Sequence, residues 1–90
     1  MPHLGGSHHG TEGARRAGEL LREAQRIPGI APGRDSYVTN QLVDLLAGPL
    51  REPGKAVIEL RRLIERYPNS RAAEYARVAL ARIKQDLIGR

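Results

Sequence analysis

GKAVIELRRLIERYPNSRAAEYARVALARIKQDL, residues 54–87, is the segment with the clearest structural pattern in this chain. In its first half, apolar residues recur at steps of three and four, which is the spacing of one helix face. Pro68 ends this helix because its ring removes a backbone donor and moves Tyr67 out of the helical conformation. Asn69 or Ser70 then caps a second helix, and so short a turn predicts an antiparallel helix pair. The apolar positions of the first helix are Ala56, Val57, Leu60, Leu63, Ile64 and Tyr67.

The second helix of this pair has a buried face made mostly of alanine. Small side chains allow two helices to approach closely, so we expect tight packing of this helix on the preceding one. Gly89 follows as a helix stop. The residues of the face are Ala72, Ala73, Ala76, Ala79, Leu80, Ile83 and Leu87.

Two further helices are expected before this pair. One begins at Ala14 and ends at Pro28-Gly29, and the turn-rich segment 28–34 follows it. Asp35 or Ser36 is expected to cap the next helix, which ends at Gly48-Pro49, and Pro53-Gly54 opens the helix after it. No segment shows the two-residue alternation of a strand. The sequence therefore predicts an all-α fold of antiparallel helical hairpins with about four helices.

Residues 1–13 have a different composition, with four glycines, all three histidines and no apolar periodicity. We expect them to be a disordered tail, either native or left over from recombinant cloning, ahead of a helical domain over residues 14–90. The histidines are His3, His8 and His9. A flexible segment has no fixed third ligand, so we expect no metal site there.

Composition excludes several classes of protein. The chain has no cysteine, which excludes disulfide scaffolds, thiolate zinc sites and cysteine nucleophiles. It has no apolar run long enough for a transmembrane span and no apolar core of a signal peptide, so we expect a cytoplasmic protein, or a periplasmic one if this is a segment of an exported protein. Catalysis is not expected, because no base, phosphate-binding loop or nucleophile is placed for it, and no cofactor is expected.

The spacing within residues 54–87 resembles the tetratricopeptide repeat. In that family the second helix of a repeat has a small residue, then apolar residues four and seven positions later, and a proline five positions after that, as in Ala56, Leu60, Leu63 and Pro68. The Tyr-Pro-Asn-Ser turn is similar to the bacterial variant found in outer-membrane assembly lipoproteins and Tol-Pal coordinator proteins. Over residues 37–47, where a first repeat helix would lie, Val43 alone among the characteristic positions fits the family pattern.

The resemblance implies a short solenoid that acts as a protein–protein interaction adaptor and presents a groove to a partner segment. Large apolar residues off the buried face, Tyr75 and Val78, would contact the partner. Arg71 and Arg82 would form ion pairs with its carboxylates. Tyr37, Gln41 and Asp44 on the preceding helix could face the same groove.

Two other functions are compatible with the sequence. The net charge of +5, with 13 arginines, would suit a nucleic acid or another anionic surface, bound through Arg61, Arg62, Arg66, Arg77 and Arg82. Many of these arginines have acidic residues three or four positions away, which favours a solvated, salt-bridged surface. Alternatively, the apolar residues Ile58 and Val78 could be self-association surfaces, which would make the chain a structural homo-oligomer or part of a longer solenoid.

Overall fold

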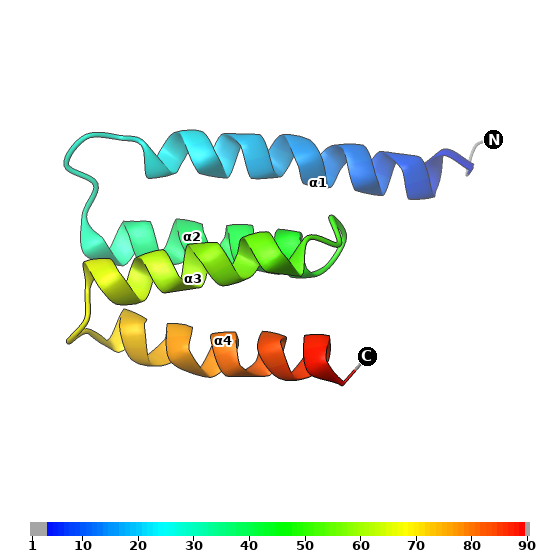
Figure 1. The fold of residues 1–90 in the computed structure, drawn as a ribbon. Coiled ribbons are helices and arrows are strands. Elements are labelled where there is room, and N and C mark those ends of the chain that lie inside the picture. Colours follow the sequence, from blue (N-terminus) through cyan, green and yellow to red (C-terminus); the bar gives the residue numbers. More distant parts are fainter. Residues whose placement is uncertain (1–3, 90) are drawn as a thin grey trace.

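The computed structural model describes residues 4–89, with side chains described from residue 11 onward, and contains four α-helices and no strand in that range. Figure 1 shows consecutive helices running in opposite directions, and each one packs against the next in the sequence. The predicted all-α fold of antiparallel hairpins is therefore confirmed. The helices are α1 (Leu4–Gln25), α2 (Pro32–Ala47), α3 (Pro53–Arg66) and α4 (Arg71–Ile88).

The molecule is thin, with principal extents of 50 × 36 × 15 Å. Helices α2 and α3 lie in the middle, while α1 packs on α2 at one end and α4 packs mainly on α3 at the other (Figure 1). Helix α4 also touches α2. Both terminal helices therefore have one side that no other helix covers. No helix in the described residues has the length and apolar character needed to cross a membrane.

Most helix boundaries lie where proline and glycine predicted them. Helix α2 ends immediately before Gly48, α3 begins at Pro53, and α3 ends before Tyr67 because Pro68 follows. Helix α4 begins after Ser70, whose Oγ accepts a hydrogen bond of 3.1 Å from the backbone N–H of Ala73. This serine cap satisfies one of the free donors at the start of α4.

The start of α2 differs from the prediction. Neither Asp35 nor Ser36 caps the helix, because α2 already begins at Pro32, with Ala31 as its N-cap. Proline suits the first helical position, since its missing N–H would have no partner there in any case. Asp35 consequently lies inside the helix, where it is fully buried.

Helix α1 begins at Leu4, whereas the sequence placed its start at Ala14. Ala14 is nevertheless the first buried residue of the described side chains, and residues 11–13 before it are exposed. The prediction for residues 1–3, and for the side chains of the three histidines, lies outside what the structure describes.

The core is shared by α2, α3 and α4. Its largest fully buried side chains are Leu42 and Leu46 of α2 and Leu60 and Leu63 of α3. Helix α4 contributes two fully buried alanines, Ala73 and Ala76. Their small side chains allow the close helix packing that the sequence predicted.

Candidate interaction surface

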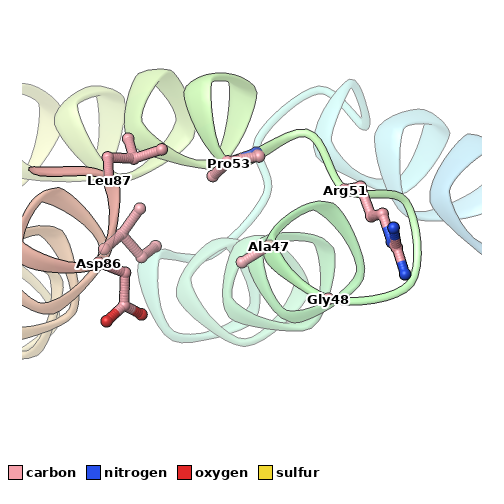
Figure 2. Close-up of a pocket in the computed structure, with 7 residues that line it drawn as sticks. Ala47, Gly48, Arg51, Pro53, Asp86 and Leu87 are labelled. Atoms are coloured by element: carbon pink, nitrogen blue, oxygen red, sulfur yellow. The ribbon is translucent and has the colours of Figure 1, made fainter. Parts of the chain in front are cut away.

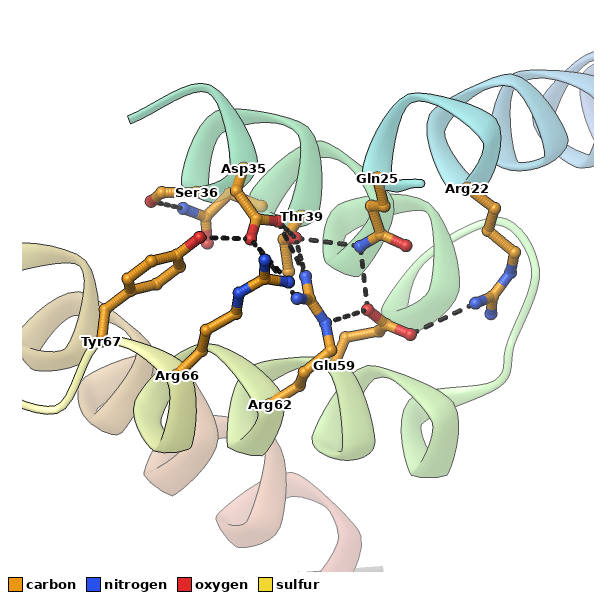
Figure 3. Close-up of polar contacts among 10 residues, drawn as sticks. Arg22, Gln25, Asp35, Ser36, Thr39, Glu59, Arg62, Arg66 and Tyr67 are labelled. Atoms are coloured by element: carbon orange, nitrogen blue, oxygen red, sulfur yellow. Dashed lines mark hydrogen bonds and ion pairs between the residues drawn. The ribbon is translucent and has the colours of Figure 1, made fainter. Parts of the chain in front are cut away.

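A polar network joins α2 to the end of α3 (Figure 3). At its centre is the buried carboxylate of Asp35. Arg62 donates two hydrogen bonds to this carboxylate, from Nη2 to Oδ1 at 2.9 Å and from Nη1 to Oδ2 at 3.4 Å. The hydroxyl of Tyr67 donates to Oδ2 at 2.8 Å, and Arg66 adds an ion pair at 3.7 Å. Asp35 therefore ties the start of α2 to the last two turns of α3.

A second group of contacts extends the network to α1. Gln25 donates from Nε2 to Thr39 Oγ1 and to Glu59 Oε1, at 2.9 Å each. Arg22 pairs with the other oxygen of Glu59 at 3.2 Å. Thr39 is itself fully buried and donates to Asp35. Figure 3 shows this continuous chain of contacts across three helices.

The environment of the network shifts the pKa values of Asp35 and Tyr67. Burial raises the pKa of Asp35, but hydrogen bonds from Arg62 and Tyr67 and the charge of Arg62 outweigh it, so the pKa lies below the ordinary 3.8. Burial and the hydrogen bond to Asp35 raise the pKa of Tyr67 above 10.0. Every buried polar side-chain atom in the described residues has a hydrogen-bond partner. The network thus stabilises the packing of α1, α2 and α3 and leaves no buried polar group for a ligand in that part of the chain.

Sequence reasoning missed this network, although one signal was present. Asp35 stands four residues before Thr39, and together with Leu42 and Leu46 it lies on the buried face of α2. An aspartate on the apolar face of a helix requires a partner, because an unpaired buried charge is costly. That partner, Arg62, is 27 residues away, and local spacing could not identify it.

A hollow of about 530 Å³ lies between the C-terminal ends of α2 and α4, beside the α2–α3 turn (Figure 2). Much of its lining is apolar, and one cation and one anion are included. The lining residues are Ala47, Gly48, Arg51, Pro53, Ile83, Asp86 and Leu87. None of these residues was predicted as a site. Ile83 and Leu87 were assigned to the buried face of α4, and the other five residues were given no binding role.

The two charged residues of this hollow are held by ordered backbone and form no ion pair within the described residues. Arg51 has a left-handed backbone conformation, with φ of 53°, and its N–H donates to the carbonyl of Gly48 at 3.0 Å. Asp86 lies in the last turn of α4. Asp86 forms no ion pair with Arg82, which lies four residues before it on α4, so the hollow keeps both charges available to a partner.

The outer face of α4 carries the four predicted site residues of that helix, and all four are exposed. Tyr75 is 71% exposed and Val78 is 60% exposed, between Arg71 and Arg82 along the helix. These four residues follow one another at steps of four, three and four, so they share one helix face. We call them the α4 face. None of its residues forms an ion pair in the described structure, and neither does any other charged residue of α4.

The predicted residues of α2 are placed differently. Gln41 and Asp44 line a second hollow, of about 400 Å³, between α1 and α2. Tyr37 is exposed and lines neither of these hollows. Gln41 and Asp44 therefore face α1. The residue of α2 that shares a hollow with α4 is Ala47, three residues after Asp44. The other lining residues of the second hollow are Ala17, Leu20, Leu21 and Leu45.

Comparison of the chain with protein-family models, with curated proteins and with solved structures gave no match.

Proposed function

We propose that this chain is a non-catalytic protein–protein interaction module that binds a segment of another protein along the α4 face. The observation that carries the proposal is the exposure of Tyr75 and Val78 side by side on one helix. Tyrosine supplies a large contact area at low entropic cost, and partly exposed aromatic residues are frequent anchors of protein interfaces. Arg71 and Arg82, which have no acidic partner in the described structure, would pair with carboxylates of the bound segment.

Rigid presentation supports this mechanism. The opposite side of α4 is fixed by Ala73 and Ala76, which are fully buried, and the start of the helix is fixed by the Ser70 cap. The backbone of such a helix needs little reordering when a partner binds, so less of the contact energy is lost to entropy. The resemblance to tetratricopeptide repeats agrees with this proposal, since repeats of that kind present side chains from stacked helices. Gln41 and Asp44 are left out of the proposed surface because they face α1.

Binding to nucleic acid is less well supported by the contacts of the arginines. Arg62 and Arg66 pair with Asp35, and Arg77 donates to the backbone carbonyl of Pro68 at 3.2 Å. Three of the five arginines proposed for an anionic ligand are therefore already engaged. The α4 face also offers a single aromatic residue for stacking, whereas strong single-strand binding uses several.

The test is affinity capture followed by direct binding. Wild-type protein and a Tyr75→Ala, Arg82→Glu double variant are used to capture partners, and each captured protein is then measured by calorimetry. We expect the double variant to weaken binding by more than about tenfold, because it removes an apolar anchor and reverses a rim charge. Ile58→Ala is the matched control, since Ile58 is 65% exposed on α3, away from the α4 face.

Two results would contradict the proposal. One is a partner that binds the double variant as tightly as the wild type while circular dichroism shows an intact helical fold. The other is an affinity for DNA or RNA that falls steeply with salt in both proteins, which would favour the anionic ligand.

A further inference from the structure

The hollow between α2 and α4 has two charges of opposite sign and no partner for either in the described residues. Figure 2 shows Asp86 and Arg51 on opposite sides of Ala47, one on α4 and the other on the α2–α3 turn. An apolar lining that carries one cation and one anion is complementary to a surface of the same kind. We propose that this hollow is the interface of a symmetric homodimer.

Two-fold symmetry gives both charges a partner. In such an interface, residue i of one copy contacts residue j of the other, and j contacts i. Arg51 of each copy would therefore pair with Asp86 of the other, which makes two ion pairs from one type of contact. The short turn holds the backbone of Arg51 in its left-handed conformation, and Arg51 lines the hollow.

The apolar part of the interface comes from the same segment. Leu87 follows Asp86 directly and is 45% exposed, which is a large exposure for a leucine that lines a hollow. When Asp86 reaches Arg51 of the other copy, Leu87 is carried toward the other hollow, where Ala47 and Ile83 offer apolar contacts. Burial of this leucine in both copies adds a hydrophobic contribution that the monomer lacks.

Two other exposed surfaces in the described residues lack this self-complementary character. The α4 face carries Arg71 and Arg82, so a two-fold contact there would bring cations together. The hollow between α1 and α2 has Asp44 as the charged residue of its lining, so a two-fold contact there would bring carboxylates together. Like charges in contact across an interface are strongly unfavourable. Charge complementarity thus selects the hollow between α2 and α4 for a second copy of the chain.

Charge reversal tests the proposal with the full chain in sedimentation equilibrium at physiological salt. We expect the wild type to be a dimer, and Arg51→Glu and Asp86→Arg each to weaken association by about tenfold or more, because both contacts become like-charged. A mixture of the two single variants should recover a dimer. In the mixed dimer the introduced glutamate meets the introduced arginine, and the unchanged Arg51 of one variant meets the unchanged Asp86 of the other. The double variant Arg51→Glu, Asp86→Arg should also dimerise, because each of its two contacts again joins opposite charges.

Lys84→Glu is the matched control, because it reverses an exposed charge on α4 that lies outside both the hollow and the α4 face, and it should leave the mass unchanged. Circular dichroism of each variant shows whether its helices are intact. A wild-type monomer at about 1 mM would overturn the proposal, because a specific dimer should form well below that concentration. Single variants that dimerise like the wild type, or a mixture of folded variants that stays monomeric, would also overturn it. None of these measurements depends on Tyr75 or on any partner of the α4 face.

Discussion

The hydroxyl of Tyr67 donates a hydrogen bond of 2.8 Å to Oδ2 of Asp35, across 32 residues of sequence. Tyr67 directly follows α3, and Asp35 lies in the first turn of α2. The same tyrosine therefore ends a helix before Pro68 and closes the helical hairpin through its side chain. Arg66 also stacks over the ring of Tyr67, with its guanidinium carbon 5.7 Å from the ring centre.

Tyr67→Phe should destabilise the protein by about 1–2 kcal/mol, because it removes a donor to a buried carboxylate and leaves the aromatic ring in place. The measurement is urea unfolding followed by circular dichroism. Tyr75→Phe is the matched control, since the Tyr75 side chain is exposed, and its midpoint should stay within error of the wild type. Equal midpoints for all three proteins would mean that the hydrogen bond contributes nothing to stability.

Asp35 should make stability depend on pH in the acid range. Its pKa is lower in the folded state than the ordinary 3.8, so the unfolded chain takes up its proton first as the pH falls. The stabilisation from this ionised carboxylate is complete above the unfolded pKa and is lost as the pH falls from about 4 toward the lower folded pKa.

Asp35→Asn is the variant that checks this dependence. At pH 7 it should cost about 3 kcal/mol, because Arg62 loses its buried counter-charge. The loss of stability between about pH 5 and pH 2 should be smaller than in the wild type, since one carboxylate no longer titrates. An acid dependence identical to that of the wild type would show that other carboxylates cause it.

Gly18→Ala should stabilise the protein by about 1 kcal/mol. Gly18 is buried within α1, and a methyl group there would lie 3.8 Å from side-chain carbons of Leu42 and Leu50, at ordinary contact distance. Alanine would add this contact and a better helix propensity. Gly13→Ala is the control, because no atom lies within 4 Å of the added group and only the propensity changes. Thermal unfolding should rank Gly18→Ala above Gly13→Ala, and the reverse order would contradict the packing of α1 on α2.

Gly48→Ala should have the opposite effect. A methyl group at this position would lie 2.9 Å from the backbone carbonyl oxygen of Asp44, which belongs to α2 and cannot move aside without distorting the helix end. We expect a loss of about 1–2 kcal/mol from this overpacking, measured by urea unfolding. Gly54→Ala, where the added group meets nothing within 4 Å and lies within α3, should not destabilise the protein, because only the helix propensity changes. A Gly48→Ala protein as stable as Gly54→Ala would show that the turn adjusts freely.

The sequence was sufficient for the order of the helices and for most of their boundaries, and insufficient for what joins them. Pro53 and Pro68 set helix boundaries through their own covalent structure, and the Ser70 cap acts within three residues, so local rules found all of these features. Asp35 looked like a cap because aspartate is favoured at helix starts. Its actual role depends on Arg62 and Tyr67, which tertiary packing brings near.

The candidate surfaces also differ in how far the sequence could predict them. Exposure of Tyr75 and Val78 followed from helical periodicity alone, because a residue opposite an alanine face points to solvent. The hollow did not follow from periodicity, since it depends on where α4 ends relative to the α2–α3 turn. Likewise, the orientation of Gln41 and Asp44 toward α1 depends on the rotation of α2, which the network of Asp35 helps to fix.

The packing of each helix on its neighbour in sequence also determines how the chain should fold. Such contacts join residues that are close in the chain, so little loop-closure entropy is lost before a contact forms, and low contact order of this kind goes with fast folding. Helices α2 and α3 share the largest buried leucines and the Asp35 network, so we expect their hairpin to form first. Helices α1 and α4 would then add on either side. Amide hydrogen exchange should accordingly be slowest in α2 and α3 and fastest at the two outer ends of the chain.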